Sequence, residues 1–215
     1  MKQLMNTIKK AQSVQCTNCH APVEIIGNPK RCQLLVCGYC GTVMDYKNEL
    51  RALYAYTEVQ KPASHLRIGM QANIEGITFK ISALVVYETL QGKEEDWVEY
   101  QLYAPNYGYA LLIIKDGVCC FLRKIYHLPK PNVWLLKAGD SFLAKGQQYI
   151  IDQFSLTRVL HSEGALLDKI KQDKRDKQVF ARVGDQCFYS KYNLNKVIYY
   201  QGFYIDKQQL EGRFV

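Results

Sequence analysis

The residues of this chain best suited to chemistry are four cysteines near its start. Cys16 and Cys19 form one Cys-x-x-Cys pair, Cys37 and Cys40 form a second, and the stretch 20–36 separates the two pairs. Each pair brings two thiolates onto one ion from a tight turn, and two pairs at this separation complete the tetrahedral sulfur shell of a zinc ribbon. We therefore predict a zinc ribbon over residues 1–44 with one structural Zn²⁺. Because so short a segment has no core of its own, the ion would supply most of its folding free energy, on the order of 10 kcal/mol.

Other chemistries fit these cysteines less well. Cys16 to His20 matches the attachment motif of c-type haem, but that chemistry belongs to exported proteins and leaves the second pair unexplained. A thioredoxin-like redox pair needs a strand before it and a helix after it, whereas Ala21-Pro22 favours a turn. Four thiolates leave no open position for a bound water, so we expect a structural ion. Cys32 lies between the pairs and could displace a ligand, although the spacing argues against it.

The composition is that of a soluble globular protein rich in strands. Hydrophobic residues make up 48% of the chain and charged residues 22%, and 16 tyrosines favour strands over helices. The start has no apolar run of the kind found in signal peptides, and no segment approaches the roughly 20 apolar residues of a membrane span. We therefore expect a cytoplasmic protein with reduced thiols. Cys119, Cys120 and Cys187 fall in strand-like runs and are expected to be small core residues.

The net charge of +8 is spread along the chain. The basic excess is +3 over residues 1–60, +1 over 61–130 and +4 over 131–215. Charge that is not concentrated is only a weak indication of a nucleic acid or an anionic membrane as partner. Asp168 to Arg175 interleaves Asp with Lys, which favours a solvated face, with anion binding as the alternative. The wider stretch 161–177 is interpreted as a basic loop that could be helical.

The rest of the chain divides at its prolines. Residues 45–62 place apolar side chains near helical spacing, which predicts a short connecting helix and linker. Residues 63–130 alternate apolar and polar side chains, as from Ile77 to Tyr87, and predict a β module of five strands with one buried face. Residues 131–215 predict a second β module of about five strands.

The second module repeats landmarks of the first. Four positions of the first module recur in the second at one constant offset and with similar residues: Gly69, Gly76, Phe79 and Ile81 recur as Gly139, Gly146, Tyr149 and Ile151. Each copy has a short strand, a glycine turn and a long strand whose first inward residue is aromatic. We therefore predict a mostly-β protein with a ribbon, a short helix and two related, barrel-like modules that arose by internal duplication.

Trp97, Glu99 and Tyr100 form the most distinctive cluster outside the cysteines. Trp97 and Glu99 lie on the strand face opposite Val98, Tyr100 and Leu102, where they could border a binding groove. A strand packed between two modules would show the same pattern. The sequence contains no recognisable nucleophile with its base and no phosphate-binding glycine loop, so no catalytic residue is assigned. We expect a protein that is not an enzyme, although acidic residues or a histidine that meet in space could still form an active site.

Together these runs resemble a bacterial family, the domain of unknown function numbered four-one-seven-eight, whose members often carry an N-terminal zinc ribbon. The resemblance extends from Cys16 over most of the chain. It is carried by Gly69, Gly76, Trp97, Glu99, Tyr100, Gly108, Tyr109, Gly164 and Gly202. The family often continues after the later glycine with an acidic residue and a proline, whereas Gly164 is followed here by Ala-Leu-Leu. The resemblance implies no established activity, but genes of the family lie near polyamine-synthesis and membrane-stress genes, which implies a partner.

The sequence therefore favours a zinc-binding adaptor whose β modules present a groove or a strand edge to an unidentified protein partner. Strand addition uses backbone groups and leaves no motif in the sequence. The alternative is a nucleic-acid-binding protein that uses the zinc ribbon and basic β surfaces. The two hypotheses differ in salt dependence, because binding to phosphates weakens steeply as salt rises.

Overall fold

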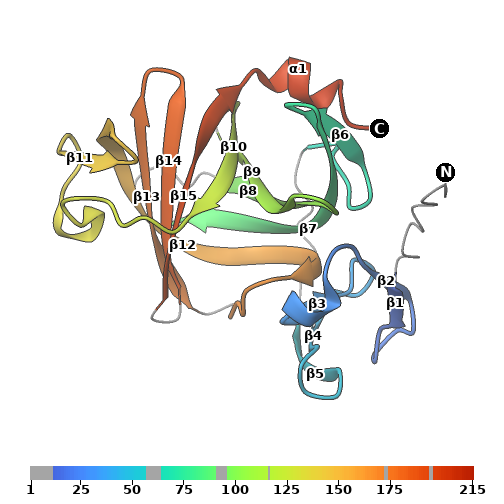
Figure 1. Ribbon diagram of the computed structural model, residues 1–215. Helices are drawn as coiled ribbons and strands as arrows, with labels where there is room; N and C mark the ends of the chain where they lie inside the picture. Colours follow the sequence, from blue (N-terminus) through green and yellow to red (C-terminus); the bar gives the residue numbers. More distant parts are fainter. Residues whose placement is uncertain (1–11, 57–63, 91–95, 116, 172–173, 194–195) are drawn as a thin grey trace, which may run out of the picture.

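The computed structural model shows a chain built almost entirely of strands (Figure 1). It describes residues 12–56, 64–90, 96–115, 117–171, 174–193 and 196–215. The strands are β1 (Gln12–Gln15), β2 (Pro22–Ile25), β3 (Leu34–Val36), β4 (Thr42–Asp45), β5 (Arg51–Ala55), β6 (Gln71–Ile74), β7 (Ile77–Thr89), β8 (Asp96–Ala104), β9 (Gly108–Lys115), β10 (Val118–Ile125), β11 (Ser141–Ala144), β12 (Gln147–Leu166), β13 (Arg175–Val183), β14 (Gln186–Asn193) and β15 (Lys196–Ile205). The helical turns are η1 (Pro29–Arg31), η2 (Val133–Leu135) and α1 (Lys207–Glu211).

Eight of these strands close into one antiparallel barrel. Their order is β7-β8-β9-β10-β15-β14-β13-β12, and β12 pairs back onto β7 through Val159 with Tyr87 and Gly164 with Ala83. The mostly-β fold class is confirmed. The prediction of two separate barrel-like modules is wrong, because the β10–β15 and β7–β12 pairings join the two sets of strands into a single ring. Closure of the ring removes the free edges that each set alone would expose.

The barrel strands are buried on both faces. On β7, Val85 belongs to the cluster that fills the barrel, while Leu84 and Val86 belong to a second cluster outside it. The predicted strand at Ile77 to Tyr87 is therefore present, but the prediction of one buried face is wrong. A third cluster lies outside the barrel on the opposite set of strands, under β11.

Each outer cluster is completed by the segment that leaves the other half of the barrel. After β10, the chain pairs Lys130 with Leu143 of β11 and places Val133 in the cluster under β11. After β15, Val215 exchanges two backbone hydrogen bonds with Gln71 of β6, and the cluster there includes Leu210 and Phe214. In Figure 1 α1 lies beside β6 on one side of the barrel, and β11 lies at the other end. The two halves are thus interlocked.

The zinc-ribbon segment is continuous with the barrel. β3 pairs with the end of β12, from Leu34 with Leu166 to Val36 with Gly164, and β4 and β5 extend the sheet beyond it. Leu34, Val36 and Val43 pack in the same cluster as the barrel interior. The ribbon therefore packs against the barrel and shares its sheet, and it is not a separate unit joined only by a linker.

Two sequence-based expectations are corrected in this region. The helix expected within residues 45–62 is absent from the described part of that stretch, where residues 46–50 form a turn and β5 follows; residues 57–63 lie outside the described residues. The loop expected over 161–177 begins later, because β12 continues to Leu166. The first part of β12 pairs with β13, and its last part pairs with β7 and β3.

Candidate functional site

The two Cys-x-x-Cys pairs lie on matching backbone turns. The amide of Cys16 donates to the carbonyl of Ala21 and that of His20 donates back to Cys16, at 2.9 and 3.0 Å. Around the second pair, Cys37 donates to Thr42 and Gly41 donates to Cys37, at 3.0 and 2.9 Å. The residue after each second cysteine has a left-handed backbone, with φ of 60° at His20 and 68° at Gly41. Glycine suits that conformation and histidine tolerates it less readily, so the turn itself is the common feature.

These turns bring the four thiols together. The ligand atoms of Cys16, Cys19, Cys37 and Cys40 all lie within 4.8 Å of one another. The Sγ atoms of Cys16 and Cys40 are 3.7 Å apart, and those of Cys19 and Cys37 are 3.6 Å apart. Four soft donors at this spacing fit one tetrahedral metal ion. The predicted ligand set therefore forms a candidate metal centre.

Hydrogen bonds around the cluster favour a thiolate at one position. Burial would raise the pKa of the Cys40 thiol, but its hydrogen bonds with Thr42, including one of 3.1 Å to the hydroxyl, outweigh burial and lower the pKa to about 6. Burial instead raises the pKa of Cys37 to about 12. A bound cation would favour the thiolate at all four positions, because metal ligation requires deprotonated sulfur.

The metal centre is tied to the barrel through a small core. Cys16 and Cys37 are buried with Leu35 and Met44 of β3 and β4, and the same cluster includes Ala165 of β12. Cys32 belongs to this cluster too, and its thiol donates to the carbonyl of Leu34 at 3.3 Å instead of joining the four ligands. The four thiols therefore lie between the β1–β2 hairpin and the sheet that continues into the barrel.

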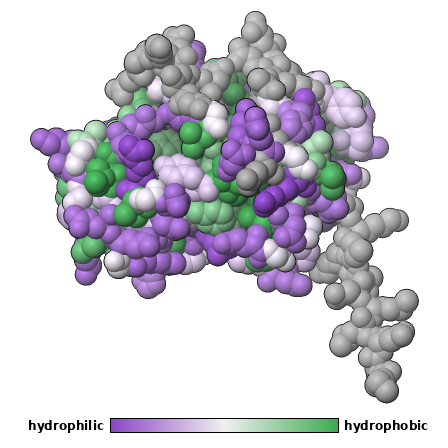
Figure 2. Space-filling view, turned by 90° about the horizontal axis from the view of Figure 1, so that it is seen from above, coloured by the Kyte–Doolittle hydropathy of each residue, from purple (hydrophilic) through white to green (hydrophobic). Residues whose placement is uncertain are grey.

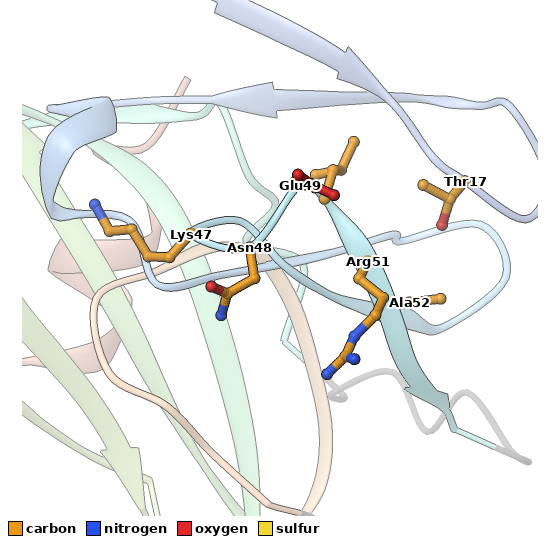
Figure 3. Close-up of a pocket in the computed structure, with 7 residues that line it drawn as sticks. Thr17, Lys47, Asn48, Glu49, Arg51 and Ala52 are labelled. Carbon is orange, nitrogen blue, oxygen red and sulfur yellow. The ribbon is translucent and has the colours of Figure 1, made fainter.

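Beside the metal centre, β5 forms the outer edge of that sheet. It pairs only with β4 in the described structure, and its residues are mostly exposed. An open hollow lies next to it, lined by Thr17, Lys47, Asn48, Glu49, Leu50, Arg51 and Ala52. Figure 3 shows Thr17, from the first cysteine turn, across the hollow from the turn and strand that carry Glu49 and Arg51. Sequence analysis missed this edge because the stretch was interpreted as a helix.

The binding surface predicted at Trp97, Glu99 and Tyr100 is wrong. Trp97 is 1% exposed and Glu99 and Tyr100 are 0% exposed. The predicted alternation is present, since Trp97 belongs to the cluster inside the barrel and Tyr100 to the cluster outside it. Closure of the barrel covers the inner face of β8, and the outer cluster that includes Leu210 and Phe214 covers the other face, so neither face can border an open groove.

Inside the barrel Glu99 forms a buried ion pair. It accepts from Nζ of Lys191 at 2.8 Å and from the hydroxyl of Tyr189 at 3.4 Å. Burial disfavours the ammonium of Lys191, but the Glu99 carboxylate outweighs burial and raises the pKa of Lys191 well above its usual range. Asp176 is nearby, and burial raises the pKa of its carboxyl to about 6 despite Lys191. A buried pair of this kind requires both partners, because either alone is an uncompensated charge.

Sequence reasoning did not find Lys191, although a signal was present. Lys191 alternates with Cys187 and Tyr189 on β14, so it occupies an inward position of a buried strand. A lysine at such a position requires an acidic partner.

Among the described residues, the buried side-chain nitrogen and oxygen atoms of Gln178 have no hydrogen-bond partner, and we expect ordered water beside them.

Comparison with known proteins assigns no relative. No protein family matches the chain, and neither a curated protein nor a solved structure does. The resemblance to the family of unknown function therefore stays a prediction. In the described part of the chain, none of the helices has the length and apolar character needed to cross a membrane.

Proposed function

We propose that the protein is a non-enzymatic adaptor that binds an extended segment of a partner protein along β5. The observation that carries this proposal is the position of β5, a short edge strand at the end of a sheet continuous with the barrel. An edge strand offers unpaired backbone donors and acceptors to an incoming strand, which gives affinity without a sequence motif. The hollow beside β5 offers Arg51 to side chains of the partner, whereas the ammonium of Lys47 donates to the carbonyl of Lys30.

Backbone pairing indicates which amide is available for the partner. Tyr56 donates to the carbonyl of Gly41 at 3.1 Å, so its amide points toward the sheet. Amides alternate in direction along a strand, so the amide of Ala55 points to the open edge. Leu53 is an extra residue in the register between β4 and β5, and such bulges hinder indiscriminate edge pairing. A partner must therefore match a short, kinked edge.

We further propose that the ion is Zn²⁺ and that it is structural. Zn–S bonds of about 2.3 Å in a tetrahedron place neighbouring sulfurs about 3.8 Å apart, and the two Sγ distances of 3.7 and 3.6 Å support this assignment. The ion would join the first cysteine turn to the turn between β3 and β4, and β4 is the strand with which β5 pairs. Because reduced thiols are typical of the cytoplasm, we propose that the protein acts there.

Selection of peptides from a random displayed library on the full-length protein tests the docking strand. We expect wild-type protein to select peptides that lose binding with Ala55→Pro, which removes the outward amide, and keep it with Ala55→Val, which retains that amide. Both substitutions are at an exposed edge residue. Equal binding by Ala55→Pro, with the fold retained, would reject β5 as the docking strand.

Nucleic-acid binding is a second candidate, favoured by basic residues on the outer face of β12 and β13. Arg158 lies directly opposite Arg175 in the register, and both are exposed, as is Lys177 farther along β13. Like charges directly opposite one another destabilise a sheet, although Glu88 here forms an ion pair with Arg158. Titration of a labelled single-stranded oligonucleotide at low and moderate salt tests this candidate. Binding that weakens with salt and is lost in Arg175→Ala with Lys177→Ala would favour it over the adaptor.

We also propose that the barrel arose by internal duplication. The amide of Gly69 donates to Ile81, and the amide of Gly139 donates to Ile151, in turns at matching positions. Both long strands have a register shift directly afterwards, between Ile81 and Ala83 and between Ile151 and Gln153. Superposition of residues 69–125 on 139–205 tests the proposal, which fails if these turns do not coincide.

A further inference from the structure

Exposed apolar side chains gather at the end of the barrel that carries β11. The side chains of Tyr126, Leu128 and Leu135 are 80%, 71% and 81% exposed, and Leu143 and Ile150 are exposed as well. We call these five residues the β11 face. They all fall within the stretch 126–150, and apolar atoms are visible on the corresponding side of the molecule in Figure 2. Grouped exposed apolar residues on a folded protein indicate a surface that contacts something other than water.

The backbone places these residues around one short hairpin. Leu143 of β11 and Ile150 of β12 are diagonal neighbours on its exposed face, because Ser141 pairs with Ile150 and Leu143 pairs with Gln148. Leu128 comes shortly before Lys130, which pairs with Leu143 on the other side. Leu135 ends η2, whose Val133 packs in the same cluster as Phe142 of β11. The high exposure of these side chains shows that they project from the surface and do not line a groove.

The fold does not require apolar residues at the two hairpin positions, Leu143 and Ile150. The β6–β7 hairpin, the counterpart of this one in the first half of the chain, has the same backbone, with φ of 50° at Glu75 and 47° at Lys145 and with glycine next in both turns. At the positions of Leu143, Lys145 and Ile150 it carries Asn73, Glu75 and Lys80. The same hairpin therefore forms with polar and charged side chains, so folding alone does not account for the apolar residues at Leu143 and Ile150.

The stretch of chain that carries the β11 face is basic. Residues 124–150 contain four lysines and one aspartate, a difference of +3. Lys130, Lys137 and Lys145 are exposed among the apolar residues, and Nζ of Lys124 lies 5.2 Å from the centre of the Tyr126 ring. The aspartate, Asp140, accepts from the backbone amide of Lys137 at 3.0 Å. A surface with projecting leucines, a tyrosine and lysines is complementary to an anionic lipid bilayer.

We propose that the β11 face docks reversibly on the surface of an anionic membrane. The leucines and Ile150 enter the boundary between headgroups and acyl chains, Tyr126 lies at headgroup level, and the lysines contact lipid phosphates. A fluid bilayer accepts projecting side chains without a shaped counterpart, which fits their high exposure better than a peptide partner does. The β5 edge belongs to a different part of the chain, so membrane docking and partner binding are separable.

Vesicle co-sedimentation tests this proposal with full-length protein. The vesicles contain phosphatidylcholine alone or phosphatidylcholine with phosphatidylglycerol. We expect binding to the anionic vesicles that weakens in high salt and little binding to the neutral ones. The test variant, Leu143→Asn with Lys145→Glu, carries the residues of the β6–β7 turn and should fold normally. Its partitioning onto anionic vesicles should fall about tenfold or more, because it loses apolar contact and reverses one charge.

A matched variant makes the same chemical changes elsewhere. Val118→Asn with Lys171→Glu alters an exposed valine and an exposed lysine outside the β11 face. This variant should bind anionic vesicles nearly as well as wild type, with only the small loss expected from reversing one basic charge. The proposal is rejected if wild-type protein binds neither vesicle, or if the two variants lose binding equally. Light scattering tests a further outcome. If wild-type protein forms a dimer and does not bind vesicles, and the β11 variant is a monomer, the proposal is also rejected, because the β11 face would then join two copies of the chain. Loss of vesicle binding with peptide binding intact would leave the β5 proposal standing.

Discussion

The ribbon and the barrel hold their strands together by different means. The ribbon has short strands and a small core in which cysteines are a large part, so we expect it to depend on the proposed ion as a cross-link. The barrel has longer strands, closed hydrogen bonding and an apolar interior with an ion pair. Yet β3 belongs to both, because it pairs with β12. The comparison shows that a small unit with a candidate metal centre can be continuous with a closed barrel and share part of its core.

Removal of metal ligands should give the largest effect. With Cys37→Ser and Cys40→Ser, we expect the protein to lose its ion and the ribbon to unfold, at a cost of about 10 kcal/mol of binding free energy to the ribbon. The barrel should remain folded but melt at a lower temperature, because Leu34 and Val36 leave its interior cluster. Metal analysis and thermal melting measure both outcomes. Cys32→Ala is the matched control and should keep the ion, and zinc retained in the double variant would reject the ligand set.

The second test breaks the ion pair inside the barrel. Lys191→Met leaves the Glu99 carboxylate buried without its cation, and we expect a loss of about 3–5 kcal/mol in the free energy of unfolding. Adding Glu99→Gln should recover most of that loss, since no unpaired charge then remains. Urea denaturation of the two single variants and the double variant measures the coupling. Additive losses would show that the two residues do not depend on each other.

A third test concerns the seam between β7 and β12. Gly164 has φ of 86°, and a Cβ there would lie 2.6 Å from the carbonyl oxygen of Ser82. Gly164→Ala should therefore lower the free energy of unfolding by roughly 1–2 kcal/mol for the left-handed backbone, and by a further amount for the clash of the new Cβ. Gly146 has φ of 79° but open space around it, so Gly146→Ala should show the backbone cost alone. Equal melting temperatures for the two variants would contradict the close approach at the seam.

The smallest effect should be a change in pH dependence. Burial raises the pKa of Asp176 to about 6, above its ordinary value near 3.8. The folded state therefore holds the proton more tightly, so stability from this group is greatest below its ordinary pKa and falls as pH rises to about 6. Asp176→Asn should be more stable than wild type at neutral pH, and the advantage should disappear in acid. Melting curves over pH test this, and an advantage that grows in acid would contradict the assignment.

Local patterns predicted much of the fold. The two cysteine turns follow from spacing alone, because each is a backbone turn closed over a few neighbouring residues. The alternation around Trp97 and Glu99 correctly separated the two faces of β8. Alternation cannot tell that both faces are buried, since that depends on strands far along the chain. Glu99 pairs with the distant Lys191, and an isolated glutamate on a strand looks like a solvent-facing one.

The missed edge strand has a local cause. Leu53 is the extra residue of a bulge, so the alternating period of a strand fails at that point. Leu50, Leu53 and Tyr54 then fall at helical spacing by coincidence. The closure of the ring was also unpredictable, because each half has the length of a small barrel of its own. Only the pairings β7–β12 and β10–β15 reveal one barrel.

The central claim is that a metal-held edge strand receives a partner segment, and hydrogen–deuterium exchange measures this most directly. Exchange of the β5 amides is followed in metal-loaded protein with and without a selected peptide, and again after the metal is removed by a chelator. We predict slower exchange of β5, and of Ala55 most clearly, when the peptide binds, and no such protection once the metal is gone. Protection located elsewhere, or protection of β5 that persists without metal, would contradict the account.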